Sequence, residues 1–363
     1  MNAAFSVNLT AVATTTVKGF RPHSRCKFIH HSDYKSFNLN MFYQVKNWVV
    51  ASVAVFGVIG NVLSFVILRK EISKNTSIFY LKYLAILDVC MCASYLVFDF
   101  QNELYSHTLL LDHTLQFNHF MKRLYPYTQQ IRFCFSGVSD MLILVIAVDR
   151  FIVVRWPLKA STLISMKRAH INVVAITLLV EVTCVQLFFK RWTRRSINPC
   201  TGYERWTTRI TAFSKNLYYR YYMLFVHAPI FHMIPSVAIF MITINIIVIL
   251  KSSSDTRKHM TSSTVPSRNK QDRSLTISLV IICSIHLIKR SLLLSGAISN
   301  WLVYKYGKKA LLLPGKAPYM DGVKDLMRKV SASANFFIYV AMRESFRHRL
   351  RKMCFVIRTN GSD

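Results

Sequence analysis

The stretch SGVSDMLILVIAVDRFIVVRWPL, from Ser136 to Leu158, decides the fold of this chain. It is long enough for a helix that crosses ~30 Å of hydrocarbon, and its middle is strongly apolar. An acid–base pair, Asp149 and Arg150, follows the apolar run at the point where a membrane helix would reach water. Charges at such a depth need polar partners, so the stretch predicts a membrane span with a functional end.

Hydrophobic runs of this length recur along the 363-residue chain, of which 52% is hydrophobic. This composition is too apolar for one soluble domain. A membrane-crossing helix needs about 20 mostly apolar residues. The sequence predicts seven such spans, near residues 44–68, 78–100, 125–153, 167–189, 221–250, 273–303 and 318–342.

The predicted seven-helix region, residues 43–342, follows an N-terminal tail. Residues 1–42 are polar and basic, which predicts disorder. Asn8 begins an Asn-Leu-Thr glycosylation acceptor, usable only if this tail lies outside the cytosol.

A short helix on the membrane surface is predicted in residues 343–363. Phe346, Leu350 and Met353 recur there at helical spacing among arginines. Cys354 next to them is either a palmitoylation site or an ordinary buried thiol. The predicted fold class is therefore an all-α membrane protein, a seven-transmembrane-helix bundle with a short C-terminal amphipathic surface helix.

The net charge of +31 lies mostly between the hydrophobic runs. This placement favours a membrane surface or an anionic partner and argues against nucleic acid. Lys and Arg are similarly frequent in the loops on the two sides, so charge alone does not orient the chain.

Several short motifs together resemble the rhodopsin-like (class A) family of G-protein-coupled receptors. They match that family in order and spacing from about residue 44 to 354. The motifs are Gly60-Asn61, Leu84-Ala85 with Asp88, Asp149-Arg150-Phe151 with Trp156-Pro157-Leu158, Pro235, and Asn335-Phe336-Phe337-Ile338-Tyr339 followed by Phe346-Arg347. Within the family, the last motif resembles invertebrate neuropeptide receptors such as those for FMRFamide-like peptides.

The resemblance implies a receptor in the plasma membrane with an extracellular N-terminus and a cytoplasmic C-terminus. Its partners would be an extracellular peptide or anionic ligand and a heterotrimeric G protein, and it would not be an enzyme. Arg150 would pair with Asp149 in the resting state and meet the G protein on activation, while Tyr339 would support the active arrangement. Changing partner is a two-state switch, because a buried arginine needs one.

The resemblance also implies a polar site inside the bundle. In the family these positions hold a sodium ion and waters; here they are Asn61, Asp88, Ser139, Ser331 and Asn335. The alternative is a hydrated polar seam without an ion. No other cofactor is expected.

Three departures from the family pattern put its usual activation route in doubt. Tyr125 stands where the family has a cysteine, so Cys200 lacks its expected partner, and Cys26 is one possible replacement. The sixth span has Lys289-Arg290-Ser291-Leu292 in place of Cys-Trp-x-Pro, and Phe336 replaces a proline. A charge cluster of Asp140, His286 and Arg290 is predicted to couple the third and sixth spans instead.

Polar and charged side chains at the outer ends of two spans predict the ligand pocket. They are Gln129, Arg132, Lys324, Asp325, Arg328 and Lys329. Their positive excess favours an acidic peptide, a carboxylate or a lipid phosphate, unless these side chains snorkel above the bilayer. Lys329 also matches the retinal-binding lysine of opsins, although Arg328 beside it disfavours that chemistry.

Other classes of membrane protein remain as alternatives. A transporter would show internal repeats and broken helices, and an intramembrane enzyme would show a catalytic set; the sequence displays neither. A divergent receptor without conventional G-protein coupling is the main alternative, because of the altered sixth span and the missing cysteine.

Overall fold

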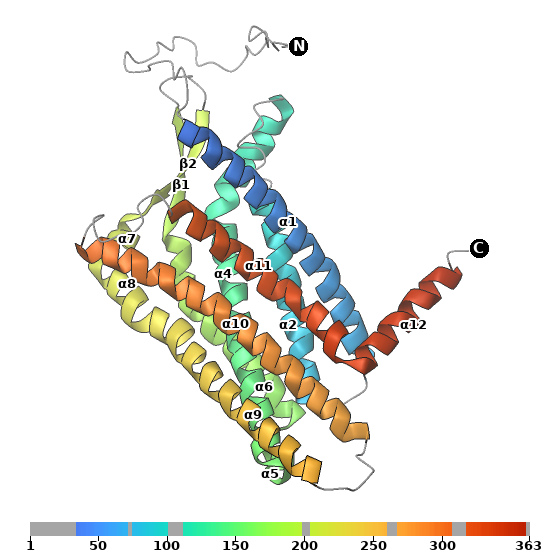
Figure 1. Cartoon of the computed structure of the whole chain (residues 1–363). Helices are drawn as coiled ribbons and strands as arrows, with labels where there is room; N and C mark the ends of the chain where they lie inside the picture. Colours follow the sequence, from blue (N-terminus) through green and yellow to red (C-terminus); the bar gives the residue numbers. More distant parts are fainter. Residues whose placement is uncertain are drawn as a thin grey trace.

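The computed structural model describes residues 34–71, 75–100, 112–197, 204–259, 267–306 and 317–360. Long helices lie side by side in these residues and form one elongated bundle (Figure 1). The long helices are α1 (Tyr34–Arg69), α2 (Thr76–Ser94), α4 (Asp112–Arg155), α6 (Met166–Cys184), α9 (Ile234–His259), α10 (Ser267–Tyr306) and α11 (Ala317–Met342).

Five helical stretches of the described residues are long and apolar enough to cross a membrane. They are Val45–Arg69, Thr76–Val97, Met166–Phe189, Leu217–Ser252 and Arg273–Ser295. The two other predicted spans coincide with α4 and α11, which carry charges such as Asp140 and Lys329 within the bundle. The five apolar stretches together with α4 and α11 form seven long helical segments, which confirms the predicted all-α bundle.

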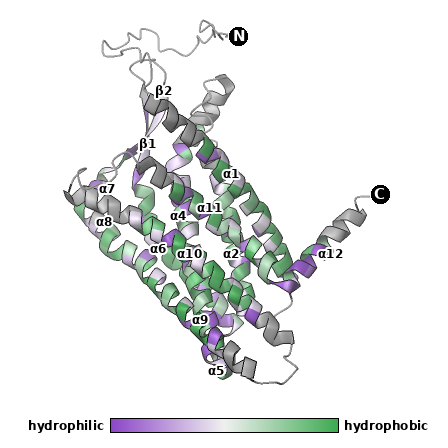
Figure 2. Ribbon diagram, viewed as in Figure 1, coloured by the Kyte–Doolittle hydropathy of each residue, from purple (hydrophilic) through white to green (hydrophobic). Residues whose placement is uncertain are grey.

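Hydrophobic residues predominate along the described parts of the bundle helices (Figure 2), and many of them are exposed on its outside. On α6, Val174, Leu178 and Val182 follow one another at helical spacing and expose 58%, 57% and 73% of their surface. Such an exposed apolar stripe would be costly in water, whereas in a bilayer it faces hydrocarbon.

The fifth span is built from several helical pieces. α8 (Leu217–Tyr221) leads into the wide-turned segments η3 (Tyr222–His227) and η4 (Pro229–Met233), and α9 continues the span. Pro229 lacks the N–H of a regular helical bond, which accounts for an irregular turn there. Other short helical segments are the wide-turned η1 (Tyr95–Phe100), the tight 3-10 helix η2 (Val185–Phe189), and the short α-helices α5 (Pro157–Leu163) and α7 (Ala212–Lys215).

A β-hairpin caps one end of the bundle, between the predicted spans 167–189 and 221–250. β1 (Arg191–Ile197) and β2 (Glu204–Ile210) are antiparallel, with Arg191 opposite Ile210. The Thr211 hydroxyl donates to Phe189 O at 2.7 Å and closes the base of the hairpin. We call this the hairpin end of the bundle and the opposite one the α12 end.

α12 (Glu344–Asn360) leaves the bundle at its other end (Figure 1). Phe346 is buried against Tyr339, with ring centroids 5.7 Å apart, and Arg349 donates to Lys70 O at 2.6 Å. These contacts agree with the predicted amphipathic helix. The side chain of Cys354 is outside the described part, so its lipidation stays a prediction.

Helices extend further than the sequence predicted at two places. α1 begins at Tyr34, inside the predicted tail of residues 1–42, and Asn8 lies outside the described residues. α9 ends at His259 and α10 begins at Ser267, so both extend beyond the predicted spans 221–250 and 273–303.

Candidate functional site

Arg150 lies in a polar clamp at the α12 end. Its guanidinium bonds the Ser77 hydroxyl at 2.5 Å and Asn75 Oδ1 at 2.7 Å, and pairs with Asp149 at 3.3 Å. Asp149 accepts from the hydroxyls of Thr76 at 2.8 Å and Ser77 at 2.6 Å. The predicted pairing of Asp149 with Arg150 is therefore present, and the first turn of α2 supplies the other contacts.

The clamp depends on how α2 begins. Asn75 caps this helix by accepting from Ser77 N at 3.0 Å, so the same amide oxygen serves both the helix and Arg150. Ser77 and Arg150 are nearly fully buried, at 0% and 2% exposed. Because a buried guanidinium is stable only when its donors are paired, the clamp holds Arg150 in one position.

A polar seam runs through the middle of the bundle. Asn335 donates to the Asp88 carboxylate at 2.7 Å, and the Ser139 hydroxyl also bonds Asp88. Asn61 donates to Gly57 O at 2.9 Å and to Ala332 O at 3.0 Å, which joins α1 to α11.

A further serine contact joins α11 to α1 beside the seam. Ser331 is half-buried, and the serine two positions later, Ser333, donates to Val53 O at 2.9 Å. Gly60 lies against Phe336, with a Cβ built on it only 2.9 Å from Phe336 Cβ, so a side chain here would push α1 from α11.

The seam offers oxygen atoms of the kind that sodium binds. Asp88 has a buried carboxylate, and Asn61 Oδ1 is buried without a hydrogen-bond partner among the described residues. Oxygen ligands suit a hard cation or a water, so these residues fit either occupant. The sodium ion itself stays a prediction.

A buried charge cluster joins α4, α10 and the fifth span. Lys289 Nζ donates to Asp140 Oδ1 at 2.6 Å, Arg290 Nη2 donates to Asp140 Oδ2, and His286 Nδ1 lies 3.4 Å from Asp140 Oδ1. Asp140 and His286 are 2% and 0% exposed. The predicted grouping of Asp140, His286 and Arg290 is therefore present.

Two members of this cluster were missed by the sequence. Lys289 was noted only as a mid-depth charge, yet it is a direct partner of Asp140. His232 Nδ1 contacts Arg290 Nη1, and its ring centroid is 5.5 Å from that of His227. One carboxylate thus accepts hydrogen bonds from two basic side chains. No pattern in the sequence pointed to His232, because its contact with Arg290 depends on how the fifth span packs against α10.

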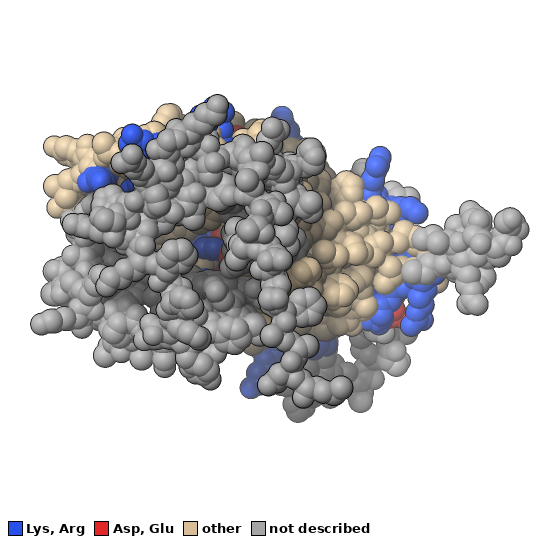
Figure 3. Space-filling model, turned by 90° about the horizontal axis from the view of Figure 1, so that it is seen from above, with Lys and Arg blue, Asp and Glu red and all other residues tan. Residues whose placement is uncertain are grey.

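A cavity of about 1320 Å³ opens above this cluster. α4, α6, the fifth span, α10 and α11 all contribute walls, and Asp140, His232 and Arg290 lie on the floor. Seen from above, basic and acidic atoms are visible at the bottom of a central hollow (Figure 3). Lys190 lines the hairpin side of the cavity, where burial and the neighbouring Arg191 lower the pKa of its amine.

Only part of the predicted ligand pocket lines this cavity. Lys324 and Arg328 do, while on α4 the lining residues are Gln130 and Phe133, the direct neighbours of the predicted Gln129 and Arg132. Gln129 instead accepts from Arg191 at 2.8 Å and anchors β1. The sequence therefore predicted the correct turn of α4, but not which side of that turn faces the cavity.

The two remaining predicted pocket residues contact each other. Lys329 donates to Asp325 at 3.1 Å, and its amine lies 4.3 Å from the centroid of the Tyr95 ring. At 2% exposed, Lys329 points away from the cavity lining. The opsin alternative gains no support from this placement.

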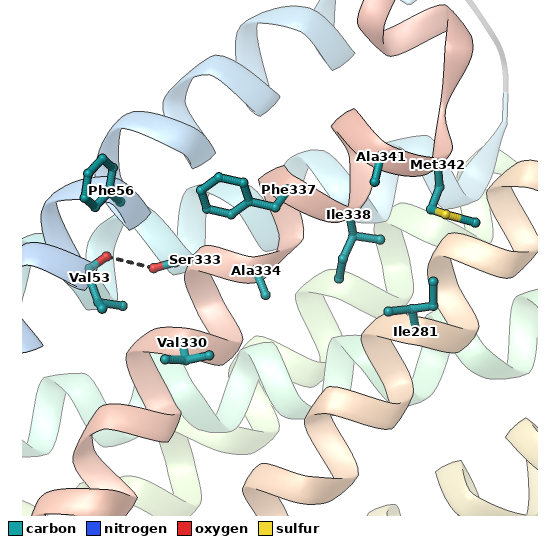
Figure 4. Close-up of a pocket in the computed structure, with 10 residues that line it drawn as sticks. All are labelled: Val53, Phe56, Ile281, Val330, Ser333, Ala334, Phe337, Ile338, Ala341 and Met342. Atoms are coloured by element: carbon teal, nitrogen blue, oxygen red, sulfur yellow. Dashed lines mark hydrogen bonds between the residues drawn. The ribbon is translucent and has the colours of Figure 1, made fainter.

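A second hollow lies between α1, α10 and α11 and is apolar (Figure 4). Phe56, Phe337 and Ile281 are among its lining residues, and the Ser333 hydroxyl is already used by Val53 O. A hollow without an available polar group cannot orient a polar ligand, so the large cavity is the candidate site.

The described cysteines carry free thiols. They are Cys90, Cys92, Cys134, Cys184 and Cys283. Cys26 and Cys200 lie outside the described residues, so their pairing stays open.

One protein family matches this chain, described as 7 transmembrane receptor (rhodopsin family), over residues 60–300. No individual curated protein matches the chain significantly. The match covers both the Arg150 clamp and the Asp140 cluster, and it extends over more than half of the sequence. The chain belongs to the rhodopsin family of seven-transmembrane receptors.

Proposed function

We propose that this receptor binds an anionic extracellular ligand at the hairpin end and activates a heterotrimeric G protein at the α12 end. It would lie in the plasma membrane with the hairpin end outside. The neuropeptide predicted from the last motif would have to be acidic, because the cavity lining holds four Lys or Arg side chains and one carboxylate.

The Arg150 clamp carries the coupling proposal. Arg150 is held by hydrogen bonds to side chains at the start of α2, and a partner protein could replace them. A buried charge that exchanges one set of partners for another gives two stable arrangements. Signalling then requires that the ligand favours the arrangement in which Arg150 has left the clamp.

An Arg150→Ala comparison tests the coupling. Cells expressing the receptor with promiscuous G proteins are screened with a peptide library, and second messengers are recorded with and without ligand. We expect Arg150→Ala to lose the response while surface expression is retained. Arg150→Lys keeps the positive charge but loses the planar guanidinium with its several N–H donors. This variant should therefore retain a reduced response.

The main alternative is a divergent receptor that does not couple to G proteins. The cluster that replaces the usual sixth-span motif favours it, because Lys289 and Arg290 tie α10 to Asp140 on α4. An Arg150→Ala receptor that signals like the parent would support this alternative.

A further inference from the structure

The large cavity is a groove along the fifth span. Its lining includes residues of this span from Leu217 to Phe240. All of these residues belong to one candidate membrane span, Leu217–Ser252, so the cavity extends along that span. Its other wall on α10 includes Leu287, Leu293 and Leu294.

The groove opens sideways toward the membrane. Phe225, Val237 and Phe240 line it and also expose 64%, 63% and 52% of their surface. They belong to a span that crosses the bilayer, so their exposed faces meet hydrocarbon. A ligand could therefore reach the groove from the bilayer, between the fifth span and α10.

The floor of the groove has a positive excess. Both Asp140 oxygens are taken, one by Lys289 and one by Arg290. Arg290 is 4% exposed, and its Nε is buried without a hydrogen-bond partner among the described residues. His232 lies against the same guanidinium. A buried cation with an unused donor is stabilised by an anion.

We infer that the groove binds an amphiphilic anion that enters from the bilayer. A single carboxylate or phosphate head group would bind Arg290 and His232, and one acyl chain would lie along the apolar wall of the fifth span. Binding in the groove is inferred from the cavity itself. Only the effect of this binding on signalling rests on the proposed function. It selects one of the anionic ligand classes that the basic pocket allows.

The apolar walls favour an acyl chain over an acidic peptide. A peptide buries backbone amides and carbonyls that each need a partner. Along the fifth span the lining is mostly apolar, apart from His227, His232 and Ser236, and the Ser236 hydroxyl already donates to His232 O in its own helix. An acyl chain has no backbone amides or carbonyls, so it needs no hydrogen-bond partners in the groove.

Binding to the purified full-length receptor in phosphatidylcholine nanodiscs tests this inference. The probes are 1-oleoyl lysophosphatidate, oleate, oleyl alcohol and inorganic phosphate, and the readout is the shift of Tm with probe concentration. We expect the two amphiphilic anions to raise Tm. The neutral alcohol and the head group alone should leave it unchanged.

Two variants locate the site. Val237→Trp narrows the groove and should weaken binding of the anions about tenfold or more. Val174→Trp is the matched control, because Val174 is similarly exposed at 58% on α6 but does not line the groove. Arg290→Gln should remove the preference of the groove for oleate over oleyl alcohol. If Arg290→Gln does not fold, Val237→Trp still tests the site.

Three results would overturn the inference. They are binding of oleyl alcohol as tight as that of oleate, an unchanged affinity in Val237→Trp, or a Tm shift produced by acidic peptides but not by the amphiphiles. Because the assay contains no G protein, its failure is distinct from a failure of coupling.

The same chemistry could come from an added amphiphile or from a bilayer phospholipid. Discs that contain phosphatidate, with native mass spectrometry of the washed receptor, separate these sources. A phosphatidate that stays bound and blocks the shift by lysophosphatidate would identify a bilayer lipid as the occupant; a shift that persists would identify the added amphiphile.

Discussion

At the residue scale, one buried ion pair ties the start of α12 to the end of α1. Arg343 Nη2 donates to both carboxylate oxygens of Glu71, at 3.0 and 3.2 Å. Arg343 and Glu71 are 2% and 6% exposed, so removing one partner leaves the other buried and charged. The sequence did not predict this pair, because Glu71 and Arg343 are 272 positions apart.

Glu71→Gln should destabilise the receptor by about 3 kcal/mol, because Arg343 would lose its charged partner inside the protein. Thermal unfolding in detergent measures this loss as a fall in Tm. Glu344→Gln makes the same chemical change at an exposed position and should cost less than about 0.5 kcal/mol. If the two variants unfold alike, the pair contributes little. Adding Arg343→Met to Glu71→Gln should restore part of the loss.

At the element scale, the Asp140 cluster couples α4 to α10. It could be predicted because an intramembrane charge needs a partner, and Asp140 and Arg290 occur at similar depth in two spans. The choice of Lys289 and His232 could not be predicted, since it depends on the rotation of α10 and on the irregular turns of the fifth span. The rotation of α4 was also not predictable, so Phe133 lines the cavity where the sequence predicted Arg132.

Asp140→Asn should destabilise the bundle more than Lys289→Met. The first change leaves two buried cations without a carboxylate, at a cost of about 3 kcal/mol or more. The second leaves Asp140 paired with Arg290. Tm and surface expression are measured for both variants, with Glu181→Gln on the exposed face of α6 as the control. Equal loss in the two variants would contradict the view that Asp140 is the centre of the cluster.

At the scale of the whole molecule, the seven-helix order was predictable because each span is a long apolar run. The hairpin was not, since RWTRRSI and ERWTTRI lack the apolar alternation that usually marks strands. The polar residues that link the helices were predictable as a set. Which of them pair could not be predicted from the sequence: Asn335 bonds Asp88, whereas Asn61 bonds the backbone of α11.

The clamp at the α12 end predicts how the whole bundle switches. The Ser77 hydroxyl donates to Asp149 and accepts from Arg150, so Ser77→Ala removes two charge-assisted hydrogen bonds from the resting arrangement. Each such bond contributes about 1.5–3 kcal/mol, so the equilibrium should shift about tenfold or more toward the released state. If Arg150 couples to a G protein, ligand-free signalling should rise by a similar factor, measured per receptor at the cell surface. Ser284→Ala is the matched control, because that hydroxyl bonds only the carbonyl of Val280 one turn away. An unchanged ligand-free signal in Ser77→Ala, with Arg150→Ala silent, would show that release of this clamp does not limit activation.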